Sequence, residues 1–171
     1  MKIIIRTTLI TIVLAIGFIF NGCGVYSFSG TSIQPDIETF SVEYFKNKAL
    51  LVNPSLANNI TEALIDKYRK LTKLEQVTEV GDLNIYGEIT GYEIRPMAIT
   101  SDEVAAQNRL TISLKLTYTN KKYPEDDFES NFAAYTDYDS TQQFESVEQQ
   151  LCDEIIEILI EDIFNATVAK W

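Results

Sequence analysis

Residues 109–119 read RLTISLKLTYT, and this stretch decides the fold. Apolar side chains occupy every second position, at Leu110, Ile112, Leu114, Leu116 and Tyr118. Polar or charged side chains fill the positions between them, at Thr111, Ser113, Lys115 and Thr117. A period of two is typical of a β-strand with one face in a hydrophobic core and the other face polar. We therefore expect a sheet that is covered by other elements on one face only.

Three further segments predict strands. In residues 39–45, Phe40, Val42 and Tyr44 alternate with polar residues, which is typical of a half-buried strand. A long strand beginning at Leu83 contains glycines that predict a bend, and another strand covers residues 128–135. Residues 74–78 form a short extended piece, and we expect residues 97–108 to be a flexible polar loop.

Two segments have helical periodicity. Residues 54–72 follow a predicted cap at Asn53, and their apolar face consists of Leu56, Ile60, Ala63, Leu64, Tyr68 and Leu71. Ser146 and Gln149 match a capping box that would open a long C-terminal helix. The apolar face of that helix consists of Leu151, Cys152, Ile155, Ile156, Leu159, Ile160 and Ile163.

The predicted order is therefore β-α-β-β-β-α. Consecutive strands pair through short loops, and helices cover the apolar face of a sheet. We predict an α+β fold in which a four-stranded mixed or antiparallel sheet has two helices packed on one face. The opposite face carries Thr111, Ser113, Lys115, Thr117 and Thr119, with Tyr86, Glu88, Thr90 and Tyr92 on the neighbouring strand. This face is either solvated or a partner surface, for which its aromatic residues are suited.

The N-terminus has the build of an export signal. Lys2 and Arg6 flank an apolar stretch at residues 7–20, which is too short for a bilayer-spanning helix. Asn21-Gly22-Cys23 then follows, which resembles a lipobox although Phe20 stands where Leu is usual. We predict a signal peptide at 1–22, lipidation of Cys23, a lipidated tether at 23–36 and a single domain at 37–171. The alternative is a soluble secreted protein in which Cys23 and Cys152 form a disulfide.

Composition restricts the function. Residues 1–22 hold two of the 14 basic residues and none of the 25 acidic ones, so residues 23–171 carry a formal net charge of −13. Nucleic acid is therefore a disfavoured partner. The chain has no histidine, which removes the commonest general base and metal ligand, and we expect no cofactor or metal. Cys152 lies among Ile and Leu residues, and we expect it to be buried.

Several of these features together resemble one family. The Cys23-Gly24-Val25-Tyr26-Ser27-Phe28 start, the strand entry Gln107-Asn108-Arg109-Leu110-Thr111-Ile112, Tyr123-Pro124 and the amphipathic final helix resemble LptE, the lipopolysaccharide-assembly lipoproteins, in their Bacteroidota-type form. The resemblance covers residues 23–171, and it depends on the combination because no short motif is diagnostic alone.

The resemblance implies a non-enzymatic subunit of the lipopolysaccharide transport translocon. Such proteins are plugs and assembly factors of the β-barrel LptD, sit in the outer membrane through the acylated cysteine, and contact lipopolysaccharide. The domain would face the periplasm or lie within the barrel lumen. Basic positions contact lipopolysaccharide in the family, and charge alone makes Arg95, Arg109, Lys121 and Lys122 the candidates here. Alternatively, these four residues are solvated positions at a strand end and in a turn, without a ligand.

Two other functions compete with this interpretation. The chain could be a lipid-anchored binding or assembly module of another envelope complex, in which case it would not co-purify with a β-barrel. It could also be a hydrolase that uses carboxylates from residues 125–127 or 102–103. The sequence supplies no nucleophile, base and orienting group around those carboxylates, so we expect no catalytic residues.

Overall fold

The computed structural model describes residues 33–51, 53–97 and 106–168. Its elements are β1 (Thr39–Val42), β2 (Lys46–Asn47), α2 (Leu56–Leu71), β3 (Glu75–Gln76), β4 (Leu83–Pro96), β5 (Gln107–Asn120), the 3-10 helix η2 (Pro124–Asp126), β6 (Phe128–Asp139) and α3 (Phe144–Val168). The predicted signal peptide, Cys23, the tether up to residue 32 and residues 98–105 of the predicted loop lie outside the described residues. No helix within the described ranges has the length and apolarity needed to cross a membrane.

Six strands form one mixed sheet in the order β3-β1-β4-β5-β6, with β2 also paired to β4. β1 runs parallel to β3 and β4, whereas β4, β5 and β6 are successive antiparallel neighbours. The predicted α+β class is confirmed. The predicted number of four strands is wrong. The short extended segment after α2 forms an edge strand, β3, beside β1. The chain after β1 pairs with β4 a second time and forms the separate strand β2.

The first predicted strand is interrupted at residues 43–45. Phe40 is fully buried as expected, but Tyr44 is 58% exposed and Phe45 is fully buried in its place. The Phe45 N–H donates to the Thr61 hydroxyl on α2 at 3.2 Å. This hydrogen bond holds the Phe45 backbone against the helix while its side chain packs in the core. A Cβ on Gly87 would lie 2.7 Å from the Phe45 ring, so the ring fills space that only glycine leaves free. The alternation that predicted a continuous strand therefore fails at Tyr44.

A β-bulge in β4 reverses the direction of its side chains. The register with β5 shifts between Ile89 and Gly91, in agreement with the predicted bend at the glycines. Because one extra residue moves the following side chains to the opposite face, Tyr92 is only 5% exposed and lies in the core. Its predicted place on the polar face is wrong, and Glu93 pairs with Thr111 there instead.

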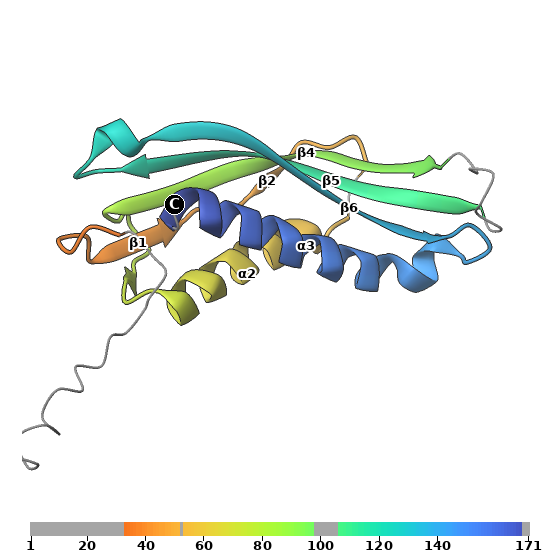
Figure 1. Ribbon diagram of the computed structural model, residues 1–171, viewed down its shortest axis with the longest axis horizontal. Coiled ribbons are helices and arrows are strands. Elements are labelled where there is room, and N and C mark those ends of the chain that lie inside the picture. The colour runs from red at the N-terminus through yellow and green to blue at the C-terminus, as the bar shows by residue number, and fades with distance from the viewer. Residues whose placement is uncertain (1–32, 52, 98–105, 169–171) are drawn as a thin grey trace, which may run out of the picture.

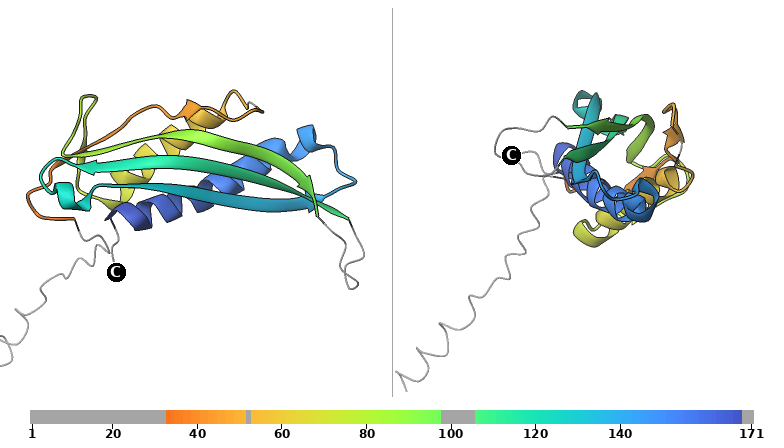
Figure 2. Two further views of the ribbon diagram at one scale, coloured as in Figure 1. Left: turned by 90° about the horizontal axis from the view of Figure 1, so that it is seen from above. Right: turned by 90° about the vertical axis from the view of Figure 1, so that its right-hand side faces the viewer.

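Both helices cover the same face of the sheet, as predicted (Figures 1 and 2). Their buried side chains meet the apolar residues of β5, including Leu110, Ile112, Leu114 and Leu116, in one core. The Tyr68 hydroxyl on α2 donates to the Thr167 hydroxyl on α3 at 2.5 Å, so a hydrogen bond as well as packing joins the two helices.

The helix ends differ from the predictions. α2 begins at Leu56, and Asn53 caps the preceding turn by accepting the Ser55 N–H at 3.0 Å. Leu71, predicted on the buried face, is 47% exposed at the last position of α2. The predicted capping box is wrong, because α3 begins at Phe144 and the Ser146 hydroxyl donates to the Gln143 carbonyl within the first turn.

Candidate functional site

The sheet surface that faces away from the helices is the candidate site, and we call it the open face. Alternation along the three long strands places these side chains on it: Tyr86, Glu88, Glu93 and Arg95 of β4, Arg109, Thr111, Ser113, Lys115 and Thr117 of β5, and Glu129, Asn131, Ala133, Tyr135 and Asp137 of β6. Four residues of β5 for which the sequence left a partner surface as one of two interpretations, Thr111, Ser113, Lys115 and Thr117, lie in one row along the middle of this face. Of these, Lys115 is exposed and the other three are half-buried by neighbouring side chains.

Ion pairs across the ladders neutralise charges on this face. Arg109 donates two hydrogen bonds to Asp137, at 2.7 and 2.8 Å, and its guanidinium lies 3.6 Å from the centre of the Tyr135 ring. The hydrogen bonds from Arg109 lower the pKa of Asp137, and those to Asp137 raise the pKa of Arg109. Lys115 pairs with Glu129 at 2.9 Å, and this contact raises the pKa of Lys115. Both pairs join β5 to β6.

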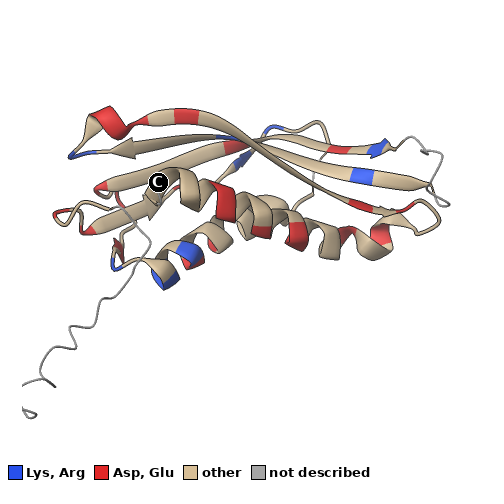
Figure 3. Cartoon of the chain, viewed as in Figure 1, with Lys and Arg blue, Asp and Glu red and all other residues tan. Residues whose placement is uncertain are grey.

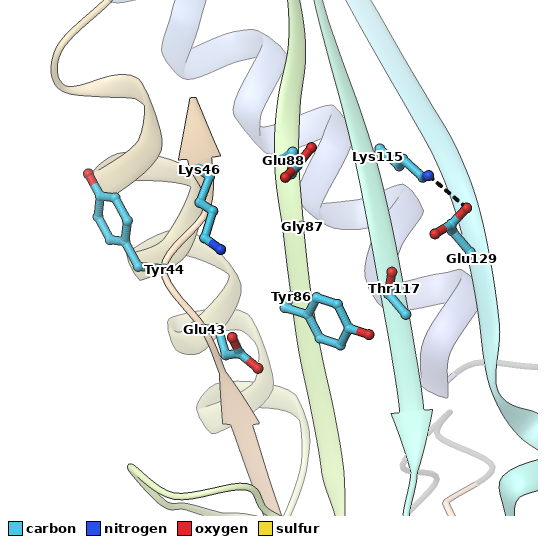
Figure 4. A pocket seen from close by; sticks show the side chains of 9 residues that line it. All are labelled: Glu43, Tyr44, Lys46, Tyr86, Gly87, Glu88, Lys115, Thr117 and Glu129. Carbon is cyan, nitrogen blue, oxygen red and sulfur yellow. Dashed lines mark ion pairs between the residues drawn. The ribbon is translucent and has the colours of Figure 1, made fainter. Parts of the chain in front are cut away.

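A shallow depression of about 270 Å³ lies on the open face beside the β1–β2 segment. Its lining consists of Glu43, Tyr44, Lys46, Tyr86, Gly87, Glu88, Lys115, Thr117 and Glu129. Figure 4 shows Tyr44 and Lys46 on one side, Tyr86 in the middle and the Lys115–Glu129 pair on the other side. Exposed aromatic rings beside the paired charges of Lys115 and Glu129 are suited to a protein interface, where Tyr is enriched.

The helix layer has a different surface. α3 carries seven carboxylates and no Lys or Arg, at Glu145, Glu148, Asp153, Glu154, Glu157, Glu161 and Asp162. Figure 3 marks acidic positions in red along the helix. Lys67 on α2 pairs with Glu161. A second hollow of about 480 Å³ lies between the helices, with Ala63, Leu71, Ile156 and Ile160 in its lining.

Residues 37–167 match the family described as LptE, lipopolysaccharide-assembly. The chain belongs to the LptE family. The resemblance drawn from the sequence is thereby confirmed, and the match covers nearly all of the described domain. No curated protein matches the chain at a significant level.

Several solved structures are distantly similar to this LptE-family protein. A minor lipoprotein from Acinetobacter baumannii is 11% identical, with a TM-score of 0.44 over 74% of this chain and 89% of the other. The hypothetical protein CT253 from Chlamydia trachomatis is 7% identical, with a TM-score of 0.49 over 78% of this chain and 99% of the other. An uncharacterized lipoprotein B from Nitrosomonas europaea is 13% identical, with a TM-score of 0.48 over 74% of this chain and 79% of the other. The family assignment rests on the match over residues 37–167 alone.

The four basic candidates for lipopolysaccharide contact fall into two groups in this LptE-family protein. Arg95 and Arg109 are cross-strand neighbours, whereas Lys121 and Lys122 directly follow the other end of β5. The length of β5 separates the groups by about 40 Å at 3.3 Å per residue. Arg95 pairs with Glu93 at 2.6 Å, and Lys122 lies 3.5 Å from Asp82 and also donates to the Asp36 carbonyl. The structure therefore does not gather all four into one site.

Cys152 is a free, buried cysteine on α3, as predicted. Burial raises the pKa of its thiol, and its Sγ lies 3.7 Å from the Tyr92 hydroxyl. That hydroxyl donates to Glu148 at 2.5 Å. Within the described residues, no group of His, Cys, Asp and Glu side chains is arranged to hold a metal ion.

Sequence reasoning missed one side of the depression. Tyr44 was predicted to be buried, and Lys46 lies in a strand of two residues, which is too short to leave a periodic signal. The signal that the sequence does contain is the run of charged residues Glu43, Lys46 and Lys48, which indicates an exposed segment.

Proposed function

We propose that this LptE-family protein is a lipid-anchored, non-enzymatic subunit of the lipopolysaccharide transport translocon. In this role it plugs an LptD-type β-barrel of the outer membrane, assists its assembly and contacts lipopolysaccharide. The observation that carries the proposal is the family match over residues 37–167, which spans nearly the whole folded domain. A plug needs a stable scaffold with a surface for the barrel, and the one-sided sheet provides both.

The open face is the proposed docking surface for the barrel. Thr111, Ser113, Lys115 and Thr117 form its central row, and the depression with Tyr44 and Tyr86 lies beside them. Charged groups lose hydration when a partner covers them, and this cost is smaller when they are already paired. Arg109 and Lys115 are in ion pairs, whereas among the described residues Glu161 is the one α3 carboxylate with a Lys or Arg partner. Contact through the open face therefore costs less desolvation.

Lipidation of Cys23 is the proposed anchor. It would place the folded domain next to the outer membrane, facing the periplasm or inside the barrel lumen. Several acyl chains hold a protein on a membrane far better than a single chain, at about 0.8 kcal/mol per buried methylene.

Lipopolysaccharide contact is proposed for the basic candidates, with Arg95 and Arg109 as the stronger pair. Their guanidinium groups belong to neighbouring strands, and guanidinium donors suit phosphate and carboxylate oxygens. Anionic groups of the glycolipid would compete with Glu93 and Asp137 for these donors.

Purification of the tagged protein from detergent-solubilised outer membrane tests the proposal. We expect an LptD-type barrel to accompany the wild-type protein in a fixed ratio. Recovery of another envelope complex without any barrel would contradict the proposal and would favour a lipid-anchored module of that complex.

A further inference from the structure

β6 forms an open edge of the sheet. It pairs with β5 along all of its twelve residues, and no described residue pairs with its other side. The backbone N–H and C=O groups on an unpaired edge are a template for another strand.

The register identifies the residues whose backbone points outward. The Ser140 N–H donates to the Ala106 carbonyl, and the Met97 N–H donates to the Gln107 carbonyl. Even-numbered residues of β5 therefore direct their backbone groups towards β6, since these directions alternate along a strand. Their partners in β6 are the even-numbered residues, from Phe128 to Tyr138. The outward-directed backbone groups belong to the odd-numbered residues of β6. Glu129, Asn131, Ala133, Tyr135 and Asp137 have exposed side chains on the open face, and Asp139 at the end of the strand is half-buried.

The described edge lacks the features that usually protect one. β6 contains no proline, no lysine and no bulge. Its carboxylates at Glu129 and Asp137 are held across the ladder by Lys115 and Arg109, which leaves the centre of the edge uncharged. That centre is Asn131, Ala133 and the 53% exposed Tyr135.

We infer that the β6 edge receives an extended strand of the barrel partner, which adds to the sheet beside β6. This inference rests on the proposed function and names the contact through which the partner is held. Glu129 and Asp137 flank an uncharged centre, so the added strand carries uncharged residues in its middle, and a Lys or Arg beside either carboxylate shares it with Lys115 or Arg109. Backbone hydrogen bonds supply the contact, and alternate side chains reach the open face.

A second copy of the chain fits this edge poorly. In an antiparallel arrangement centred on Ala133, Glu129 of each copy would lie opposite Asp137 of the other. β6 has no Lys or Arg to place opposite these carboxylates, so two copies gain no charge complementarity there. The whole chain also carries a formal net charge of −11, so two copies repel each other.

Proline at position 133 is the decisive variant, because the Ala133 N–H points outward and takes no part in the ladder with β5. Ala133→Pro should leave the fold intact while it blocks an added strand. Ala133→Ser keeps the N–H and is the matched control. We expect the serine variant to recover as much barrel as wild type from detergent-solubilised outer membrane, and the proline variant to recover about tenfold less per tagged protein.

Hydrogen exchange on the wild-type protein provides a second readout that needs no variant. In the isolated protein, the amides of Asn131, Ala133 and Tyr135 should exchange rapidly while those of Phe132 and Ala134 are protected. In the purified complex with the barrel, all five should be protected.

Equal recovery with a folded proline variant would overturn the inference and leave the proposed function standing, as would unprotected amides at 131, 133 and 135 in the complex. Protection of these amides in the isolated protein at high concentration would assign the edge to a second copy. If no barrel accompanies even the wild-type protein, the proposed function fails and the inference fails with it.

Discussion

The Tyr68 hydroxyl on α2 donates a hydrogen bond to the Thr167 hydroxyl on α3, with both side chains buried beneath the sheet. The Thr167 hydroxyl in turn donates to the Ile163 carbonyl at 2.8 Å. Burial raises the pKa of Tyr68, which favours the neutral phenol that donates this hydrogen bond. The two helices are thus fixed relative to each other by a polar contact inside the core.

Removing either partner of this hydrogen bond should have unequal effects on stability. Tyr68→Phe leaves the Thr167 hydroxyl bonded to Ile163, so we expect the free energy of unfolding to fall by only about 0.5–1.5 kcal/mol. Thr167→Val leaves the buried Tyr68 hydroxyl without its acceptor, which should cost about 1–3 kcal/mol. Urea unfolding of the two variants checks the order, and a larger loss for Tyr68→Phe would contradict it.

Gly87 should tolerate a side chain less well than Gly91. A Cβ on Gly87 would lie 2.6 Å from the Lys115 carbonyl and 2.7 Å from the Phe45 ring. Gly87→Ala should therefore lower the free energy of unfolding by about 1–3 kcal/mol through overpacking. Gly91→Ala is the matched control, because its Cβ would lie 3.2 Å from the Ser113 side chain and at an ordinary contact distance of 3.9 Å from the Ser113 backbone nitrogen. Similar urea midpoints for both variants would show that the Phe45 ring and the Lys115 backbone both yield to the added methyl group, and would contradict the account.

The Arg109–Asp137 pair should contribute a small, pH-dependent stability. The pKa of Asp137 in the folded protein lies below its ordinary value of 3.8, chiefly because Arg109 donates hydrogen bonds to it. A lowered folded-state pKa stabilises the protein fully above the unfolded-state pKa, and the contribution disappears as the pH falls through the folded-state value. Arg109→Gln should therefore be less stable than wild type at neutral pH, and at low pH the difference should shrink to what the contact between Arg109 and the Tyr135 ring contributes. Urea unfolding across this range would contradict the account if the difference grew on acidification.

Cys23 should be the site of lipidation. Cys23→Ala should leave an uncleaved or mislocalised precursor, because the thiol is the atom that takes the acyl group. Metabolic labelling with a fatty-acid probe checks this directly, with Cys152→Ser as the control that keeps its label. Unlabelled wild-type protein would show that the protein has no lipid anchor.

The alternation in residues 109–119 was sufficient to predict the central strand and its two faces. Local periodicity succeeds there because β5 has neighbours on both sides and pairs without a bulge in its own chain. The same reasoning failed at Tyr44 and Tyr92, where a turn into the core and a bulge in β4 reverse the side chains. Such reversals depend on tertiary contacts, such as the one between Phe45 and Gly87, that no local pattern contains.

The candidate site was only partly predictable for the same reason. The row from Thr111 to Thr117 follows from alternation, whereas the partners of its charges follow from the register between strands. Glu129 meets Lys115, and Asp137 meets Arg109, because β6 pairs with β5 in one particular register. The sequence leaves that register open, and with it the placement of Arg95 beside Arg109. The separation of Arg109 from Lys121 and Lys122 already follows from the length of the predicted strand.

The central claim is that the open face docks the barrel, and opposite charges introduced on that face test it. Thr111→Arg with Thr117→Glu changes two positions of the central row without changing net charge. The matched control is Asn58→Glu with Gln150→Arg, which makes the same charge changes at exposed positions of α2 and α3.

The measurement is the amount of assembled barrel in the outer membrane of cells that express each variant, with folding of the purified proteins verified by circular dichroism. We predict that the Thr111→Arg, Thr117→Glu protein folds but lowers barrel assembly several-fold, while the helix variant matches wild type. Equal assembly with both variants, or loss of assembly with the helix variant alone, would contradict docking through the open face.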